Sequence, residues 1–314
     1  DNDWNDISDF ASDVNEDQNG NHEIKTIVSR PAIINKISEI EKNATDKTIN
    51  VGNTVLVIIG VERSYSEFDS SAIYNFVKSG GKVIIADDSG YGNSAFYGEM
   101  GTLEIGVKLR TNIVQEGCQP TEASGLVAGA IDALGSDGSG STSPKCKPAQ
   151  LYDSNHWEKP IHPKNNSIAI IDADVPRMNF NGQLMMSSPG ALTIQSGGAA
   201  EGLVWSSQKA FIDYNQDGEG GKGEGTYRED STNGVEVVAE ANIGNGTVIF
   251  ISDTSIFTNE YYDELDNRAF ILSMVNYVTG GEKHTLIFDE SRHIQSDIPV
   301  SYTHHRAHET VRNL

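Results

Sequence analysis

The sequence predicts a three-layer α/β fold with a mostly parallel central sheet. Two continuous apolar runs, Thr54–Gly60 and Lys82–Asp87, have the β-branched composition of strands that are covered on both faces. Between them, a helical pattern begins at Ser66, with Asp69 three residues later as an approximate capping box, and ends at Gly80-Gly81. A strand, a helix and a strand in this order predict a parallel pair joined by a right-handed crossover.

Further elements extend this unit in both directions. The segment Val235–Ser252 has two apolar runs around an Asn- and Gly-rich turn, which predicts a β-hairpin and therefore an antiparallel part of the sheet. Helices are predicted at Ser29–Lys42, Ser94–Met100 and Glu260–Val278, and strands at Ser167–Ile171, Ala191–Ile194, Gly202–Ser206 and Thr285–Phe288. Alternating βα units around a buried sheet are typical of a three-layer α/β domain.

The chain divides into an arm, one domain and a tail. Residues 1–24 carry eight Asp or Glu and no Lys or Arg, the composition of a solvated acidic N-terminal arm. Residues 25–295 are expected to form a single α/β domain with an irregular, Gly- and Ser-rich insertion at about 110–165. Residues 296–314 are expected to form a C-terminal tail.

The charge of the chain restricts its partners. A formal net charge of −22 argues against nucleic acid, which proteins bind through clustered Lys and Arg, and favours cations. Apolar runs such as Thr54–Ile59 are far shorter than the ~20 residues that span a bilayer. The sequence begins with Asp1, which fits a processed, exported protein whose membrane anchor, if it has one, lies outside this chain.

Cysteines and glycosylation sequons also favour export. Cys118 and Cys146 flank a low-complexity segment and are expected to form a disulfide; the alternative is two unrelated free thiols. Asn43, Asn165 and Asn245 begin Asn-x-Ser/Thr triplets, which permit glycosylation in an extracellular or cell-surface protein.

Four sequence blocks carry a family resemblance. TVLVIIG, FVKSGGKVIIADDSGYGN, the long block from GNGTVIFISDTSIF to SMVNYVTGG, and LIFDES are similar to domain-of-unknown-function family 4350. The resemblance covers about Ile33 to His293. It implies a flavodoxin-like fold akin to class I glutamine amidotransferases, in exported or membrane-anchored prokaryotic proteins, without implying a reaction.

The sequence departs from amidotransferase-like enzymes at the nucleophile. Those enzymes place a Cys on a tight turn between a strand and a helix. Here the strand Lys82–Asp87 runs into Asp88-Ser89-Gly90, where Ser89 is the nearby nucleophile and no GxSxG surrounds it. Cys118 lies in the irregular insertion. We therefore expect no amidotransferase-type catalysis.

The segment Asp213–Glu224 fits the calcium-loop pattern D-x-[DN]-x-[DN]-G-x5-E at every specified position. Calcium takes six to eight hard oxygen ligands, and alternating acidic and amide side chains converge on one point, while Gly218 permits the sharp turn. The expected ligands of Ca²⁺ are the side chains of Asp213, Asn215, Asp217 and Glu224, and the backbone carbonyl of Glu219. The alternative is a polar, Gly-rich surface loop.

A second, weaker calcium candidate lies in the acidic arm. Asp13, Asn15, Asp17 and Asn19 alternate as oxygen ligands, but Gly20 is misplaced for the pattern. The alternative is a disordered acidic segment.

Carboxylates follow the predicted parallel strands. Because ligands bind beyond the carboxyl ends of such strands, these side chains could converge as a metal or acid–base site, or could simply cap the neighbouring turns and helices. They are Asp87, Asp88, Asp253, Asp289 and Glu290.

The favoured function is a non-catalytic, calcium-stabilised binding or scaffold module, with a protein partner or self-assembly at the cell surface. One alternative is a carboxylate- or metal-dependent hydrolase at the strand ends, with the carboxylates in a shared pocket. Another is a carbohydrate-binding module that uses Trp157 or Trp205 as an aromatic platform.

Overall fold

The structure is a computed structural model of the chain. It describes residues 6–15, 21–28, 51–96, 105–110, 113–115, 118–119, 147–148, 168–187, 189–206, 211–213, 225–226 and 234–293. The helix predicted at Ser29–Lys42 and the tail at 296–314 lie outside these residues.

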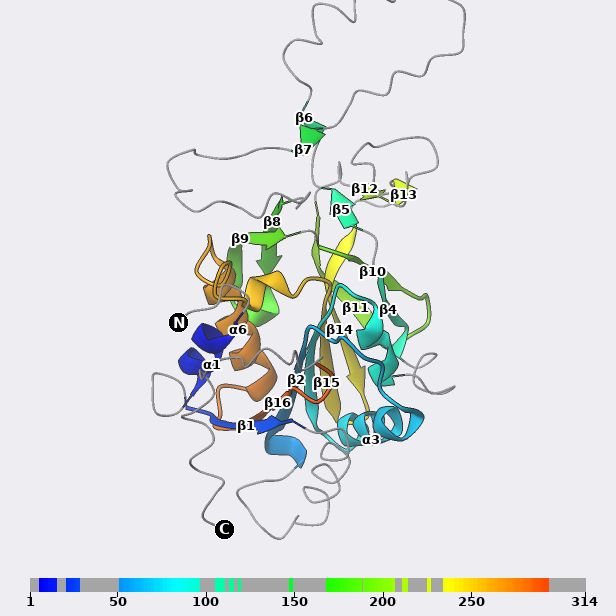
Figure 1. Cartoon of the computed structure of the whole chain (residues 1–314), viewed down its shortest axis with the longest axis vertical. Helices are drawn as coiled ribbons and strands as arrows, with labels where there is room; N and C mark the ends of the chain where they lie inside the picture. Colours follow the sequence, from blue (N-terminus) through cyan, green and yellow to red (C-terminus); the bar gives the residue numbers. More distant parts are fainter. Residues whose placement is uncertain are drawn as a thin grey trace, which may run out of the picture.

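A 7-stranded sheet forms the centre of the molecule (Figure 1). Its order is β1 (Glu23–Ile27), β16 (Thr285–Asp289), β2 (Thr54–Ile59), β3 (Lys82–Ala86), β15 (Gly246–Ile251), β14 (Glu236–Ile243) and β11 (Ala200–Trp205). Neighbours from β1 to β15 are parallel, whereas β14 is antiparallel to both β15 and β11. The fold is therefore mixed α/β with a mostly parallel central sheet, as the sequence predicts.

Two outer layers cover the sheet (Figure 1). One face packs against α6 (Asn267–Thr279), α1 (Ser8–Val14) and the hairpin of β8 (Ile168–Val175) and β9 (Phe180–Ser187). The other face packs against α3 (Glu67–Lys78), η2 (Tyr91–Phe96) and the pair of β4 (Val107–Arg110) and β10 (Ala191–Ile194). Each face has its own hydrophobic core.

The structure contains the β2–α3–β3 unit, with the buried strand and the helix cap that the sequence predicts. All residues of β2 are buried, as a strand covered on both faces requires. Ser66 caps α3 in a capping box with Asp69, and Ile73, Phe76 and Val77 form its buried face. The helix ends against the β14–β15 turn, where a side chain at Gly246 would collide with the Val77 and Gly81 carbonyls.

Helix α6 begins later than the sequence predicts, at Asn267 instead of Glu260. The buried Asn267 amide explains this start, because it bonds both backbone groups of Met185 on β9, at 2.9 and 2.8 Å, and the Tyr261 carbonyl at 2.8 Å. The preceding residues form turns instead of a helical turn. Gly280, in the left-handed conformation, ends the helix, close to the predicted end at Val278.

The acidic N-terminus is not a solvated arm where it is described, which corrects the expectation for residues 1–24. Phe10 and Val14 on α1 are 0% and 2% exposed and belong to the core beneath α6. His22 is buried, and β1 is the edge strand of the sheet. The reason is spacing: Ile7, Phe10 and Val14 recur on one helical face, while the acidic residues lie on the others.

The remaining strands and short helices are small. They are β5 (Ile113–Gln115), β6 (Cys118–Gln119), β7 (Lys147–Pro148), β12 (Phe211–Asp213), β13 (Gly225–Thr226), η1 (Val51–Asn53), η4 (Pro176–Met178) and η5 (Ser255–Phe257). Within the described residues, no helix is both long and apolar enough to cross a membrane.

Candidate functional site

The carboxyl edge of the parallel sheet carries a repeated Asp-x-Ser turn. Strands β3, β15 and β16 lead into Asp87-Asp88-Ser89, Asp253-Thr254-Ser255 and Asp289-Glu290-Ser291. In each turn, the first carboxylate accepts a hydrogen bond from the Ser backbone N–H two residues later, at 3.3, 2.7 and 3.0 Å respectively. These are Asx turns, in which an Asp side chain fixes the chain direction as the strand ends.

Asp87 organises the loop after β3. Its Oδ2 accepts the Gly92 N–H at 2.8 Å, and a side chain at position 92 would collide with the carboxyl group. The Ser89 hydroxyl lies 2.6 Å from Asp87 Oδ1 and 2.7 Å from the Val61 carbonyl, although it has only one proton to donate. Burial raises the pKa of Asp87. A protonated Asp87 would supply the missing donor.

Asp253 is fully buried at the end of β15. The Ser255 hydroxyl donates to its Oδ2 at 2.9 Å. Burial, together with the charge of Asp88, raises the pKa of Asp253 to about 7. Asp88 is half-buried, accepts the Thr254 hydroxyl at 3.2 Å, and has a pKa raised by burial and by Asp87. Asp87, Asp88 and Asp253 therefore form one electrostatically linked group.

Asp289 belongs to a different network. The Tyr65 hydroxyl donates to its Oδ2 at 2.6 Å, and burial raises the pKa of Tyr65 well above its usual value. The Arg292 guanidinium lies 4.5 Å from the Tyr65 ring centroid and donates to Asp69 at 2.5 Å. Since Asp69 also caps α3, this buried network joins the start of α3 to the end of β16.

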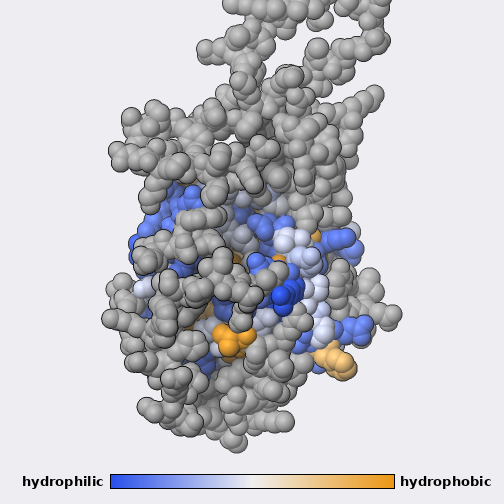
Figure 2. All heavy atoms as spheres, viewed as in Figure 1, coloured by the Kyte–Doolittle hydropathy of each residue, from blue (hydrophilic) through white to orange (hydrophobic). Residues whose placement is uncertain are grey.

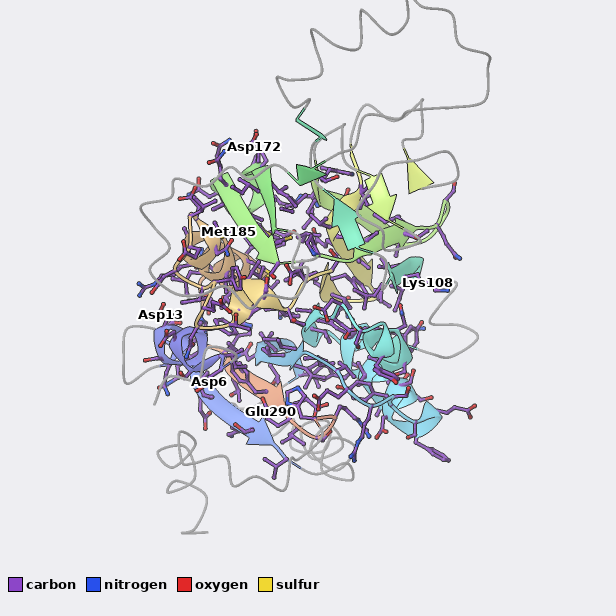
Figure 3. All side chains as sticks on the ribbon, turned by 45° about the horizontal axis from the view of Figure 1, so that its top comes forward. Asp6, Asp13, Lys108, Asp172, Met185 and Glu290 are labelled. Carbon is purple, nitrogen blue, oxygen red and sulfur yellow. The ribbon has the colours of Figure 1, made fainter. Side chains whose placement is uncertain are left out.

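His293 lies between β16 and β2. Its Nδ1 is 2.6 Å from Glu290 Oε2, and its Nε2 is 2.8 Å from the Ile59 carbonyl (Glu290 is labelled in Figure 3). Both neighbours are acceptors, so both ring nitrogens carry protons. The bond to Glu290, despite opposing burial, raises the pKa of His293 to about 9. This histidine is a structural cation at neutral pH.

The five predicted carboxylates thus fall into two groups separated by β2. Asp87, Asp88 and Asp253 interact on one side, and Asp289 and Glu290 bond to Tyr65 and His293 on the other. In the part of the chain that the structure describes, no three His, Cys, Asp or Glu side chains are arranged to hold a metal ion. The sequence did not identify Tyr65 as the partner of Asp289 or Asp69 as the partner of Arg292. The Asp-x-Ser repeat, in contrast, can be read directly from the sequence.

The predicted calcium loop is only partly described. Asp213 ends β12, which pairs with β13 so that Ile212 lies opposite Gly225. Strands instead of helices therefore flank the loop, and their pairing brings its two ends together. Asn215, Asp217, Glu219 and Glu224 lie outside the described residues.

In the weaker candidate, Asp13 bonds Arg268 at 2.7 and 2.8 Å and Tyr262 at 2.9 Å, so both of its oxygens already have donors. Asn15 is half-buried at the end of α1 and forms a β-bridge with His22. Asp17 and Asn19 are not described.

The positions of the predicted disulfide and sequons are only partly described. Strands β6 and β7 pair Cys118 with Pro148 and Gln119 with Lys147. Cys146 lies outside the described residues, so the disulfide stays a prediction. Asn245 is exposed in the β14–β15 turn, whereas Asn43 and Asn165 are not described. Trp205 is half-buried on the edge strand β11, and Trp157 lies outside the described part.

Comparisons with known proteins add little about activity. No curated protein matches the chain. Among solved structures, the "mmIFT52 N-terminal domain" is similar with a TM-score of 0.46 and 11% identity, over 84% of this chain and 99% of that one. A β-galactosidase from Bacillus circulans sp. alkalophilus matches with a TM-score of 0.34 and 12% identity, over 74% of this chain and 24% of the enzyme. At these scores, neither likeness carries an inference about function.

The family comparison concerns the C-terminal half of the domain. Residues 182–275 match the model of a family described as a domain of unknown function (DUF4350). The matched segment runs from β9 through the β14–β15 hairpin to α6 and includes Asp253. The match supports the family resemblance of this segment, and that family has no established function.

Proposed function

We propose that the chain is a non-catalytic binding or scaffold module of an exported, cell-surface protein, stabilised by calcium. The proposal that the module is non-catalytic rests on the Asx turns at the carboxyl edge of the sheet. Asp87, Asp253 and Asp289 each accept a backbone N–H of their own turn. A carboxylate that holds its own loop in place is poorly available to attack a substrate or to bind a metal.

The same geometry disfavours a hydrolase at this edge. A general base needs a free lone pair within reach of a nucleophile. Both nitrogens of His293 face acceptors, and the Ser89 hydroxyl lies between Asp87 and a carbonyl instead of beside a histidine. Asp253 has a pKa near neutrality, but its side chain is fully buried.

The calcium part of the proposal rests on the loop Asp213–Glu224. Its sequence pattern supplies the oxygen ligands, and the β12–β13 pairing closes the loop at its base. Export is supported by the acidic composition, by the pairing of β6, which contains Cys118, with β7, which follows Cys146 in the sequence, and by the exposed Asn245 sequon. These features favour a calcium-rich exterior.

A polar surface would make the contact with a protein partner or a second copy. On the face shown in Figure 2, the described surface is mostly hydrophilic, with small, separate hydrophobic spots. Among the residues that the structure describes, the large exposed hydrophobic side chains come from four separate segments: Val28, Phe68, Tyr91 and Leu265. Such scattered residues are ordinary on a soluble surface.

We also propose a class I glutamine amidotransferase-like relationship for the sheet. Parallel strands with helices on both faces support it. The five parallel strands, numbered in chain order, run 1-5-2-3-4, however, and this differs from the flavodoxin order 2-1-3-4-5. The proposed relationship therefore concerns the layered architecture and not the flavodoxin strand order.

Thermal unfolding tests the calcium-stabilised module. Calcium at about 100 times its Kd should stabilise the folded chain by about 2.7 kcal/mol, a rise in Tm of roughly 5–10 °C. Excess chelator should remove the rise, and Asp217→Ala should abolish it. Asp174→Ala, which removes an exposed acidic residue on β8, is the control for the change in charge and should keep the calcium response.

Two results would reject the calcium site. The first is a wild-type Tm that does not respond to millimolar calcium. The second is an equal response in wild type and Asp217→Ala, which would place any calcium effect elsewhere on the acidic surface.

A further inference from the structure

A pocket lies between α1, the residue before β1, and one face of α6. Its volume is about 320 Å³, and it is lined by Asp13, Val14, His22, Arg268, Leu272, Val275 and Asn276. The four α6 residues follow a spacing of i, i+4, i+7 and i+8, which puts them on one side of the helix. Figure 1 shows α1 beside α6, and Figure 3 shows Asp13 on α1 at this side of the molecule.

Part of the pocket lining is apolar. Val14 and Val275 belong to the hydrophobic core, and Leu272 packs against it. This aliphatic floor can accept the C–H face of a small ligand, since burying apolar surface is favourable. The polar groups lie around this floor.

An ion pair forms one wall. Arg268 Nε lies 2.7 Å from Asp13 Oδ2, and its NH2 lies 2.8 Å from Asp13 Oδ1, the two parallel bonds of a bidentate pair. The Tyr262 hydroxyl donates to the same carboxylate at 2.9 Å. Arg268 NH1 has only a 3.5 Å contact with Asp263, so this nitrogen can donate to a ligand. This wall is thus polar, and the two charges of the described lining residues, those of Arg268 and Asp13, balance each other.

His22 provides a donor on another side. Its Nδ1 accepts the His284 backbone N–H at 3.2 Å. Burial, with His284 nearby, lowers the pKa of His22 to about 4, so the ring is neutral and its proton is on Nε2. His22 lines the pocket, where this N–H has no protein acceptor among the described hydrogen bonds. Asn276, exposed on α6, offers both a donor and an acceptor.

We propose that this pocket binds a neutral polyhydroxy ligand of about the size of one monosaccharide. Hydroxyl groups both donate and accept, and the pocket offers both partners. Arg268 and His22 donate, Asp13 Oδ1, which accepts one hydrogen bond from Arg268, can accept a second, and Asn276 does both. An added cation would meet Arg268, and an added anion would meet Asp13 and Asp263, so the balanced wall disfavours either charge. The volume lies at the lower end of the roughly 300–1,000 Å³ of small-molecule sites, which limits the ligand to a single ring.

This site is independent of the calcium loop and of the strand-end turns. A scaffold that also recognises a sugar would attach to a glycan, which goes beyond the proposed function. The aromatic platform considered from the sequence does not enter this proposal, because Trp205 is not among the described lining residues and Trp157 lies outside the described part of the chain.

Saturation-transfer NMR and calorimetry on the full chain test the proposal. The ligands are glucose, galactose, mannose and N-acetylglucosamine, each titrated to about 50 mM. We expect saturable binding of at least one of them, with a Kd of roughly 1–10 mM. Asn276→Ala should weaken it at least tenfold. The matched control is Asn75→Ala on α3, another exposed helical Asn whose backbone carbonyl accepts a bond at the helix end, and it should leave binding unchanged.

His22→Asn is the second variant. The Asn carbonyl can accept the His284 N–H in place of Nδ1, while the shorter side chain no longer places a donor at the position of Nε2, so binding should weaken in a chain that still folds. The proposal is overturned if no sugar binds saturably, if Asn276→Ala binds like the wild type, or if sodium acetate competes for or replaces the sugar at the same site. Circular dichroism and Tm confirm that each variant is folded.

Discussion

Burial of the single residue Asp253 is expected to make the stability of the whole protein depend on pH. Its carboxyl group is fully buried, and burial raises its pKa from the ordinary 3.8 to about 7 in the folded chain. The folded chain therefore holds a proton that the unfolded chain releases between these values. The stability contributed by this proton is fully present below about pH 4 and is lost as the pH rises through 7.

Replacing Asp253 by Asn should remove this pH dependence. The Asn carbonyl can still accept the Ser255 N–H, and no charge then has to be buried at high pH. Relative to the wild type, the Tm of Asp253→Asn should increase as the pH rises from 5 to 8. Between pH 5 and the folded pKa of about 7, this change corresponds to at most about 3 kcal/mol of stability, at about 1.4 kcal/mol per pH unit. Calorimetry across this pH range measures it.

Asp172→Asn serves as the control, since this carboxyl group is exposed on β8 (labelled in Figure 3). This variant removes one carboxyl group from the surface and leaves Asp253 in place. If the Tm difference of Asp253→Asn changes with pH no more than that of this control, Asp253 ionises in the folded protein as easily as in the unfolded chain, and the burial argument for this turn is wrong.

At the scale of elements, the protonation of His22 and His284 is expected to affect how stably β1 pairs with the rest of the sheet. They precede the parallel strands β1 and β16, their rings are 6.4 Å apart, and both are 6% exposed. Burial lowers the pKa of each, that of His22 to about 4. Depressed histidine pKa values give stability that is present above about pH 6.5 and is lost as the pH falls through 4, opposite in sign to Asp253.

Mild acid should therefore open β1 before the rest of the sheet. Hydrogen exchange of residues 21–28, corrected for intrinsic rates, should be roughly ten- to thirtyfold less protected at pH 5 than at pH 7. His22→Asn, with no ring to protonate, should lose most of this difference. The β2 segment at 54–59 is the internal control. Equal loss of protection in β1 and β2 would indicate global unfolding instead of opening of the edge strand.

The elements also show which parts of the fold could be read from the sequence. The β2–α3–β3 unit and the β14–β15 hairpin were predictable, because apolar runs, a capping box and turn residues are local signals. Helix α1 was missed because its few apolar residues stand among many acidic ones, and only the core beneath α6 shows their effect. The Arg292–Asp69 pair joins residues 223 apart, and no local pattern encodes such a contact.

The candidate site could be predicted only in part, for the same reason. The position of its carboxylates followed from strand ends alone, since parallel strands bring their carboxyl termini to one edge. Their division into two groups followed from the strand order, with β2 between β16 and β3. That order depends on which long-range pairings form, and hydrophobic periodicity does not contain it.

At the scale of the whole molecule, the net charge of −22 works against folding. Bringing so many like charges into one compact body costs electrostatic energy, which salt reduces because the Debye length falls from about 30 Å at 0.01 M to about 8 Å at 0.15 M. The Tm should therefore rise by several degrees from 0.01 to 0.15 M NaCl and then level off. The same salt series with an Asp172→Asn/Asp174→Asn double variant should show a smaller rise, because two exposed acidic residues are removed.

This screening effect must be separated from specific calcium binding, since calcium also adds ionic strength. With NaCl, MgCl₂ and CaCl₂ compared at equal ionic strength, screening alone predicts nearly equal Tm values for the two divalent salts. A closed oxygen-ligand loop predicts an additional rise for calcium, because magnesium requires a stricter octahedral geometry and keeps much of its water. If the magnesium and calcium curves coincide, the acidic surface as a whole explains the stabilisation and the loop Asp213–Glu224 does not.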